Sequence, residues 1–135
     1  MPWSAVLLGV FLTTASLGQV TIRALAGSVV VDRASPTMAT AMVVVENGTM
    51  YDVYLVGAAA EVAGAVEIRE TPRGASAATV VKEVAVPAFG QLEMSHDGVH
   101  LVFKKLKRPL KSGESVPLSL FADNGLTLTV QVVVK

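Results

Sequence analysis

Apolar and polar positions alternate along most of the chain, in short runs rich in valine and other β-branched residues. Alternation places successive side chains on opposite faces of a β-strand, and no stretch keeps a helical apolar period over several turns. The pattern therefore predicts an all-β sandwich or barrel. The predicted strands cover residues 20–24, 28–33, 40–46, 52–58, 65–70, 79–86, 90–95, 99–104, 115–122 and 126–134.

Short polar pairs separate these runs. Asn47-Gly48, Asp97-Gly98 and Asn124-Gly125 are typical of tight hairpins, because these residues accept the positive φ angles that two-residue turns require. The last pair joins the clearest hairpin, in which leucine and valine alternate with threonine and glutamine. The alanine-rich stretch 58–65 could hold one helical turn.

Residues 1–18 have the layout of a signal peptide, with an apolar run and then Ser16 and Gly18 before a cut at Gln19. The run is shorter than the roughly 20 residues that a membrane span needs, so no span is expected in the mature form. No Lys or Arg precedes the run, which leaves open a disordered or membrane-tethering apolar N-terminus. We predict a periplasmic or secreted protein with one domain, residues 19–135.

Charge and composition exclude several classes of function. The sequence has 11 basic and 11 acidic residues and no cysteine. Zero formal net charge gives no reason to expect a nucleic acid or an anionic membrane as partner. Without cysteine there is no disulfide, thiolate metal site or cysteine nucleophile, and a lipid anchor near the cut is disfavoured. No Gly-x-Ser-x-Gly motif is present, and Glu67 and Glu70 point to opposite faces of a predicted strand. We therefore predict that the protein is not an enzyme.

Two other motifs have a functional and a structural interpretation. Asn47-Gly48-Thr49 matches an N-glycosylation acceptor, but a hairpin turn explains Asn-Gly without it. The segment 104–111 carries five positive charges in eight residues. It is either a docking patch for an acidic protein or, more simply, a solvated connection after a strand.

Both histidines lie in the stretch SHDGVHLVF, residues 95–103. If Asp97-Gly98 is a two-residue hairpin turn, His96 pairs with Val99 and Ser95 pairs with His100. That register puts His96 and His100 on opposite faces, so they cannot hold one metal ion together. Residue 102 shares a face with His100, whereas Met94, Leu101 and Phe103 are predicted to lie in the core.

The run VPAFGQLEMSHDGVHLVFKKLKRPLKSGESVPLSL, residues 86–120, closely resembles the signature region of the PCu(A)C family of exported copper chaperones. The segments 41–47, 55–58 and 66–70 resemble earlier segments of that family in order and approximate spacing. The resemblance implies a cupredoxin-like Greek-key β-sandwich in the periplasm. It also implies Cu(I) carriage by two histidines and two methionines, with delivery towards the Cu(A) centre of cytochrome oxidase. Thioether and imidazole suit a soft cuprous ion.

When the family's ligand positions are placed on this sequence one by one, most of the residues of that copper site are replaced. The family's first histidine falls on Arg69, one methionine falls on Ala78, and the other falls on Val102. Only the second histidine is retained, as His100. A guanidinium is permanently charged, so Arg69 cannot ligate copper and would repel it.

Four methionines could act as substitute ligands: Met38, Met42, Met50 and Met94. Met42 and Met94 are expected in the core, so Met38 and Met50, in predicted loops, are the better candidates. The first hypothesis is a copper-chaperone-family protein with weak or partner-dependent Cu(I) binding at His100 and a protein partner in cytochrome oxidase or copper handling. The alternative is a metal-free module in which Arg69, His100 and the segment 104–111 recognise an acidic group or surface.

Overall fold

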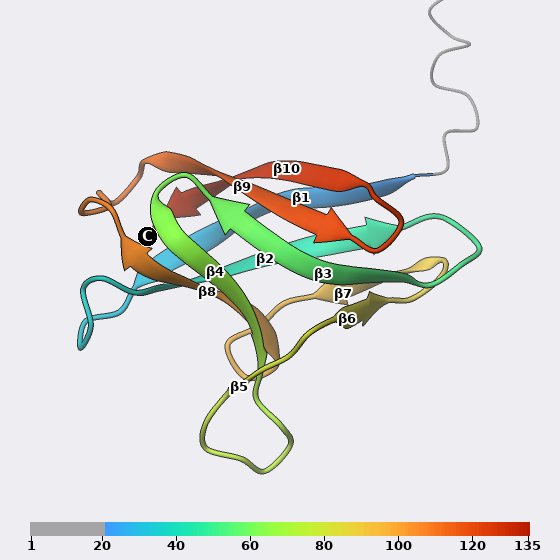
Figure 1. The fold of residues 1–135 in the computed structure, drawn as a ribbon, viewed down its shortest axis with the longest axis horizontal. Helices are drawn as coiled ribbons and strands as arrows, with labels where there is room; N and C mark the ends of the chain where they lie inside the picture. The colour runs from blue at the N-terminus through green and yellow to red at the C-terminus, as the bar shows by residue number, and fades with distance from the viewer. Residues whose placement is uncertain (1–20) are drawn as a thin grey trace, which may run out of the picture.

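The computed structural model describes residues 21–135, which form strands joined by loops and turns (Figure 1). The predicted signal peptide, residues 1–18, lies outside the described residues. Across residues 21–135 there is no helix of the length and apolarity needed to cross a bilayer. The strands are β1 (Ile22–Val31), β2 (Ala39–Asn47), β3 (Val53–Ala60), β4 (Ala63–Glu70), β5 (Thr79–Val80), β6 (Val84–Val86), β7 (Gly90–Glu93), β8 (Val99–Leu106), β9 (Ser115–Ala122) and β10 (Thr127–Val134).

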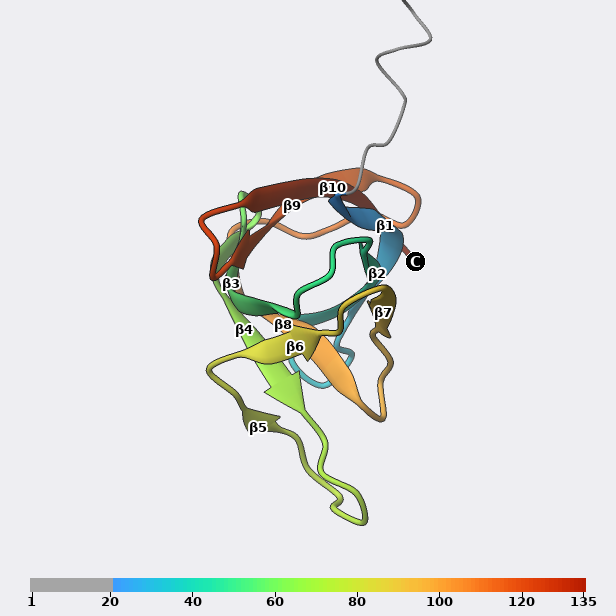
Figure 2. The same cartoon turned by 90° about the vertical axis from the view of Figure 1, so that its right-hand side faces the viewer.

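The strands form one hydrogen-bonded sheet in the order β5-β4-β8-β2-β1-β10-β9-β3-β6, and β7 also pairs with β2. All pairs are antiparallel except β1 and β10, which run parallel. The sheet curls on itself, so that β9 and β10 lie across from β4 and β8 (Figure 2). The connection between β4 and β5 projects from the body of the molecule in both views (Figures 1 and 2).

The inner face of the curled sheet holds the core, as the alternation predicts. In β2, the odd-numbered residues from Ala39 to Asn47 are buried and the even-numbered ones are half-buried. In β8, Leu101 and Phe103 are fully buried, and Met94 joins the same cluster. Burying such large apolar side chains stabilises the fold by roughly 1.5–3 kcal/mol each. The all-β prediction is confirmed, and so is the core placement of these three side chains.

Three predicted elements differ in the structure. The strands 20–24 and 28–33 are one strand, β1, with a shift in register between Leu25 and Ser28. The strand 79–86 is two, because β5 pairs with β4 and β6 pairs with β3, at opposite ends of the sheet order. The stretch 58–65 is strand, turn and strand rather than a helical turn. Pairing of β3 with β9 and of β4 with β8 overrides the helical preference of alanine there.

The turn predictions have mixed outcomes. Asn124-Gly125 does join β9 to β10, with Gly125 at φ 84° and its N–H donating to the Ala122 carbonyl at 3.1 Å. The hairpin prediction for Asn47-Gly48 is wrong, because β2 pairs with β1, β7 and β8, whereas β3 pairs with β6 and β9. The chain leaves β2 in a longer loop that Asn47 organises.

Candidate functional site

The register of β4 and β8 brings together the positions that the resemblance assigns to copper ligands. Arg69 lies directly across from His100, and Glu67 lies across from Val102. Ile68 and Leu101, which alternate with them, belong to the core, so these four side chains point to the outer face. Val102 is only 5% exposed yet lies outside the core cluster. The candidate site is therefore on the outside of the sheet, over β4 and β8.

A hydrogen bond fixes the ring of His100. Its Nδ1 lies 3.0 Å from the Gly98 carbonyl oxygen, and since a carbonyl can only accept, Nδ1 carries the proton. The same carbonyl also accepts the Thr71 N–H at 3.2 Å, which ties the turn before β8 to the end of β4. The lone pair of the ring is then on Nε2. A carbonyl partner for the second ring nitrogen is the usual support of a metal-binding histidine.

The Nε2 atom of His100 lies at the molecular surface although the residue is only 5% exposed. No buried side-chain nitrogen or oxygen in residues 21–135 lacks a hydrogen-bond partner. The one hydrogen bond of this ring uses Nδ1, so Nε2 must be in contact with solvent. The free lone pair is therefore not sealed within the core.

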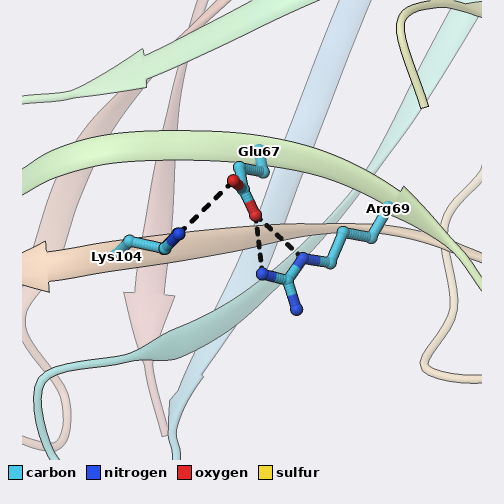
Figure 3. Close-up of polar contacts among 3 residues, drawn as sticks. All are labelled: Glu67, Arg69 and Lys104. Carbon is cyan, nitrogen blue, oxygen red and sulfur yellow. Dashed lines mark hydrogen bonds and ion pairs between the residues drawn. The ribbon is translucent and has the colours of Figure 1, made fainter. Parts of the chain in front are cut away.

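Arg69 is directed at a carboxylate (Figure 3). Its Nη2 and Nε lie 2.6 and 3.0 Å from Oε1 of Glu67, and Nζ of Lys104 lies 3.5 Å from the other carboxylate oxygen. The hydrogen bonds from Arg69 are the main reason that the pKa of Glu67 lies below its usual value. The guanidinium charge beside His100 is thus compensated, so the predicted repulsion of a cation by Arg69 is weakened.

Ala78 lies at the base of the projecting β4–β5 connection. It is half-buried and immediately precedes β5, where Val80 lies across from Arg69. Its methyl group has no donor atom for a metal. Of the four positions that the resemblance singles out, only His100 offers a lone pair.

The two histidines are neighbours, and the prediction that they lie on opposite faces is wrong. Their ring centroids are 6.1 Å apart and the ring planes differ by 27°. β7 and β8 do not form a hairpin ladder, because both pair with β2, β7 at residues 44–47 and β8 at residues 39–41. Residues 95–98 form a four-residue turn closed by the Gly98 N–H and the Ser95 carbonyl at 3.2 Å. Gly98 does not have the positive φ of a two-residue hairpin. The residue pairing that would put His96 and His100 on opposite faces therefore does not form.

Sequence reasoning missed the role of Asn47. Its side chain is 1% exposed, and Nδ2 donates to the carbonyls of Val86 and Tyr51 at 3.0 and 2.8 Å. Its Oδ1 accepts from the N–H and the hydroxyl of Thr49. A buried amide with these four bonds is not accessible for glycosylation. Two features of the sequence could have indicated this role. Asn47 lies at the end of a predicted strand, and the segment 41–47 resembles a family strand that ends in Asn.

The positively charged segment 104–111 is partly neutralised. Arg108 donates to both carboxylate oxygens of Glu114 at 2.9 and 2.8 Å, and the Lys111 N–H donates to Oε1 at 2.6 Å. These contacts hold the pKa of Glu114 at about 2. The segment therefore contains a structural clamp between β8 and β9, while its role in docking stays a prediction.

Within residues 21–135, no three His, Asp or Glu side chains gather as a metal site would require. Methionine sulfur is a further kind of ligand, which suits a soft ion. Met94 is buried in the core as expected, and Met38 and Met50 lie in loops. Met42 is half-buried on β2 and lines a surface hollow together with His96.

A family model described as "Putative lipoprotein LpqE-like" matches residues 16–134. No curated protein matches the chain. The "Solution structure of CuI-DR1885 from Deinococcus Radiodurans" is 33% identical with a TM-score of 0.68, over 90% of this chain and 82% of that one.

Two more distant structures share the fold. The "Copper-bound PCuAC domain from PmoF2" is 15% identical with a TM-score of 0.70, over 87% of this chain and 95% of that one. The "Apo PCuAC domain from PmoF1" is 13% identical with a TM-score of 0.73, over 87% and 96%. The fold is the cupredoxin-like β fold of these domains. The chain belongs to the LpqE-like family, within the PCuAC copper-chaperone-like domains that its sequence resembles.

Proposed function

We propose that this domain carries Cu(I) as exchangeable cargo, with His100 as the anchoring ligand, and passes it to a partner in cytochrome oxidase assembly. The protein acts as a carrier rather than as an enzyme. We also propose that residues 1–18 direct export, and that residues 19–135 work in the periplasm or outside the cell. The printed sequence has no cysteine, so none of its residues can carry a cysteine-linked lipid.

The observation that carries the proposal is the orientation of His100. The Gly98 carbonyl fixes the proton on Nδ1, which leaves the Nε2 lone pair at the surface and ready to bind. A neutral imidazole suits the soft cuprous ion. The similar protein from Deinococcus radiodurans is described in its Cu(I) form, which supports copper as the cargo.

Weak or partner-dependent binding follows from the replaced positions. Arg69 is engaged with Glu67, and Val102 and Ala78 have no donor atoms. A site with few ligands holds its ion less tightly and leaves coordination positions open to a partner. Such an ion can transfer by ligand exchange without first leaving the protein.

The test is an anaerobic competition for Cu(I) between the purified protein and chromophoric chelators that span a range of affinities. We expect one Cu(I) per protein, lost to a strong chelator and retained against a weak one, with His100→Ala abolishing retention. A protein that retains no Cu(I) against the weakest chelator would overturn the proposal. Mass spectrometry of the exported protein, with a new N-terminus at Gln19 expected, tests the export part separately.

The second candidate is a metal-free adaptor on the same scaffold. The network of Arg69, Glu67 and Lys104 favours it, because these charges occupy the face where the resemblance places copper ligands. An adaptor would bind an acidic protein surface in a salt-sensitive way, since exposed charges are screened by salt. Such binding, unchanged by copper, would support the adaptor over the carrier.

A further inference from the structure

We propose that His96 and Met42 join His100 as ligands of one soft monovalent ion, so that this chain has a rebuilt site with two imidazoles and a thioether. This inference rests on the proposed function, because it names the ligands for the same cargo. His96 and Met42 lie outside the positions that the resemblance assigns to copper.

The turn at residues 95–98 presents His96 to His100. Hydrogen bonds from Gly98 N–H to the Ser95 carbonyl and from Ser95 N–H to the Val99 carbonyl fix that turn. The ring centroids are 6.1 Å apart. Imidazole nitrogen binds an ion such as Zn²⁺ at about 2.0–2.1 Å, so this separation allows a shared ion once the two rings, which are stacked at 27°, turn their nitrogen edges toward it.

Met42 lies beside them on the outer face. β2 and β8 pair through Ala41 and Leu101, so Met42 and His100 are the next residues along their strands, one step beyond that pair. Ala41 and Leu101 are buried in the core, and alternation therefore turns Met42 and His100 outward. His96 and Met42 line the same surface hollow, together with Thr40 and Val30. The thioether and the two rings thus converge on one area.

The other methionines do not fit this position. Met38 lies four residues before Met42 along an extended chain, about 13 Å away at the rise of a β-strand. Met50 is 64% exposed in the loop beyond the far end of β2. Met94 is enclosed in the core. Met42 therefore replaces Met38 and Met50 as the candidate thioether ligand.

The chemistry of the three ligands matches a soft monovalent cation. Two neutral imidazoles and one thioether add no negative charge, so the ion would keep its single positive charge in the site. Hard divalent ions prefer carboxylate and water oxygens, which this set lacks. Across from His100 lies Arg69, whose charge Glu67 compensates at 2.6 Å, and the hollow lined by His96 and Met42 is also lined by one cationic and one anionic residue, Arg33 and Asp32. The two imidazoles would also suit Zn²⁺, but the thioether favours Cu(I) or its redox-inert analogue Ag(I), and the lack of oxygen ligands in this set disfavours Mg²⁺.

The test compares His96→Ala, Met42→Leu and His100→Ala with the unchanged protein in anaerobic Cu(I) competition. We expect each of the first two variants to lower the Cu(I) affinity by about 10-fold or more. Loss of a residue that only hydrogen-bonds to a metal ligand already lowers metal affinity by about 10-fold or more, and loss of a ligand should lower it at least as much. X-ray absorption at the copper edge should show one sulfur and two nitrogen neighbours, and Met42→Leu should remove the sulfur. Met50→Leu is the matched control, because it makes the same change at an exposed loop residue.

The outcomes separate the two proposals. If His100→Ala abolishes Cu(I) binding while His96→Ala and Met42→Leu bind as the unchanged protein does, the rebuilt site is wrong and the carrier function stands. If the unchanged protein binds no Cu(I), the proposed function fails and the rebuilt site fails with it. Thermal unfolding of each variant without copper checks that its fold is intact. Ag(I) titration followed by NMR gives a second readout, with the Met42 methyl signal expected to shift and the Met50 signal to stay.

Discussion

Arg69 shows how one substitution changes the chemistry of a site without disturbing its frame. The residue keeps the strand position across from His100, but its guanidinium turns to Glu67 on the same strand. The sheet would therefore hold an imidazole at this position with its Cβ about 4.5–5.5 Å from that of His100. The backbone of β4 and β8 could thus carry a ligand at this position, whereas the Arg69 side chain offers none.

Arg69→His combined with Val102→Met should raise the Cu(I) affinity by at least about tenfold, or 1.4 kcal/mol. The two changes add an imidazole across from His100 and a thioether two residues after it on the same face. Chelator competition measures the change. Arg69→Leu is the control, because it removes the charge without adding a donor. An equal gain in that control would mean that charge relief, rather than ligation, explains the effect.

Asn47 is a second residue whose side chain decides local structure. Asn47→Ala should lower the free energy of unfolding by about 2–3 kcal/mol, because the buried carbonyl of Val86 loses its hydrogen-bond donor. Urea unfolding measures this. Asn124→Ala is the matched control and should cost less than about 1 kcal/mol, since Asn124 makes a single hydrogen bond in an exposed turn. Similar losses in both variants would contradict a special role for Asn47.

At the scale of elements, the irregularity in β1 has a steric cause. A Cβ on Gly27 would lie 2.0 Å from the Met42 carbonyl oxygen and 2.7 Å from the Val43 side chain. Only glycine lets β1 approach β2 this closely where the register shifts between Leu25 and Ser28. The close approach also positions the Met42 segment of β2.

Gly27→Ala should therefore destabilise the fold by about 1–3 kcal/mol, the usual cost of overpacking. Gly57→Ala is the control, since its nearest contact would be the Phe121 ring at 3.4 Å, and it should change stability by less than about 0.5 kcal/mol. Chemical denaturation of both variants provides the comparison. A Gly27→Ala protein as stable as the Gly57→Ala protein would show that β1 can shift without cost.

The elements also show what the sequence could predict. Alternation located most strands because each has one face in the core, as β2 does. It could not predict that 79–86 divides between two ends of the sheet, since pairing partners are set by the whole fold. The resemblance located Arg69 and His100, which the register brings together. It could not place His96, because that depends on a four-residue turn whose φ angles Asp-Gly does not determine.

At the scale of the whole molecule, the ion pair of Glu114 with Arg108 closes the connection between β8 and β9, two strands that lie far apart in the sheet order. The pKa of Glu114 is about 2, below its ordinary value of 4.5. The ionised carboxylate thus stabilises the folded protein above about pH 4.5, and this contribution is lost as the pH falls from there towards 2.

Glu114→Gln should remove this part of the acid dependence. Between pH 5 and 3, the midpoint of urea unfolding should fall less steeply with pH in the variant than in the unchanged protein. Glu83→Gln, at an exposed residue, is the control and should keep the original slope. Parallel pH profiles for the unchanged protein and Glu114→Gln would contradict a stabilising role for the clamp.

The parallel pairing of β1 with β10 sets the order of events as the protein is made. β10 lies between β1 and β9, although β1 is the first described strand and β10 the last. The edge of β1 that faces β10 therefore stays unpaired until residues 127–134 have been synthesised. Pairings between segments that are far apart in the sequence also form slowly. In a chain exported as proposed, the sheet cannot close before its C-terminal end is available. The ribosome and the translocation machinery would then handle a chain whose sheet is not yet closed, and folding would be completed after passage.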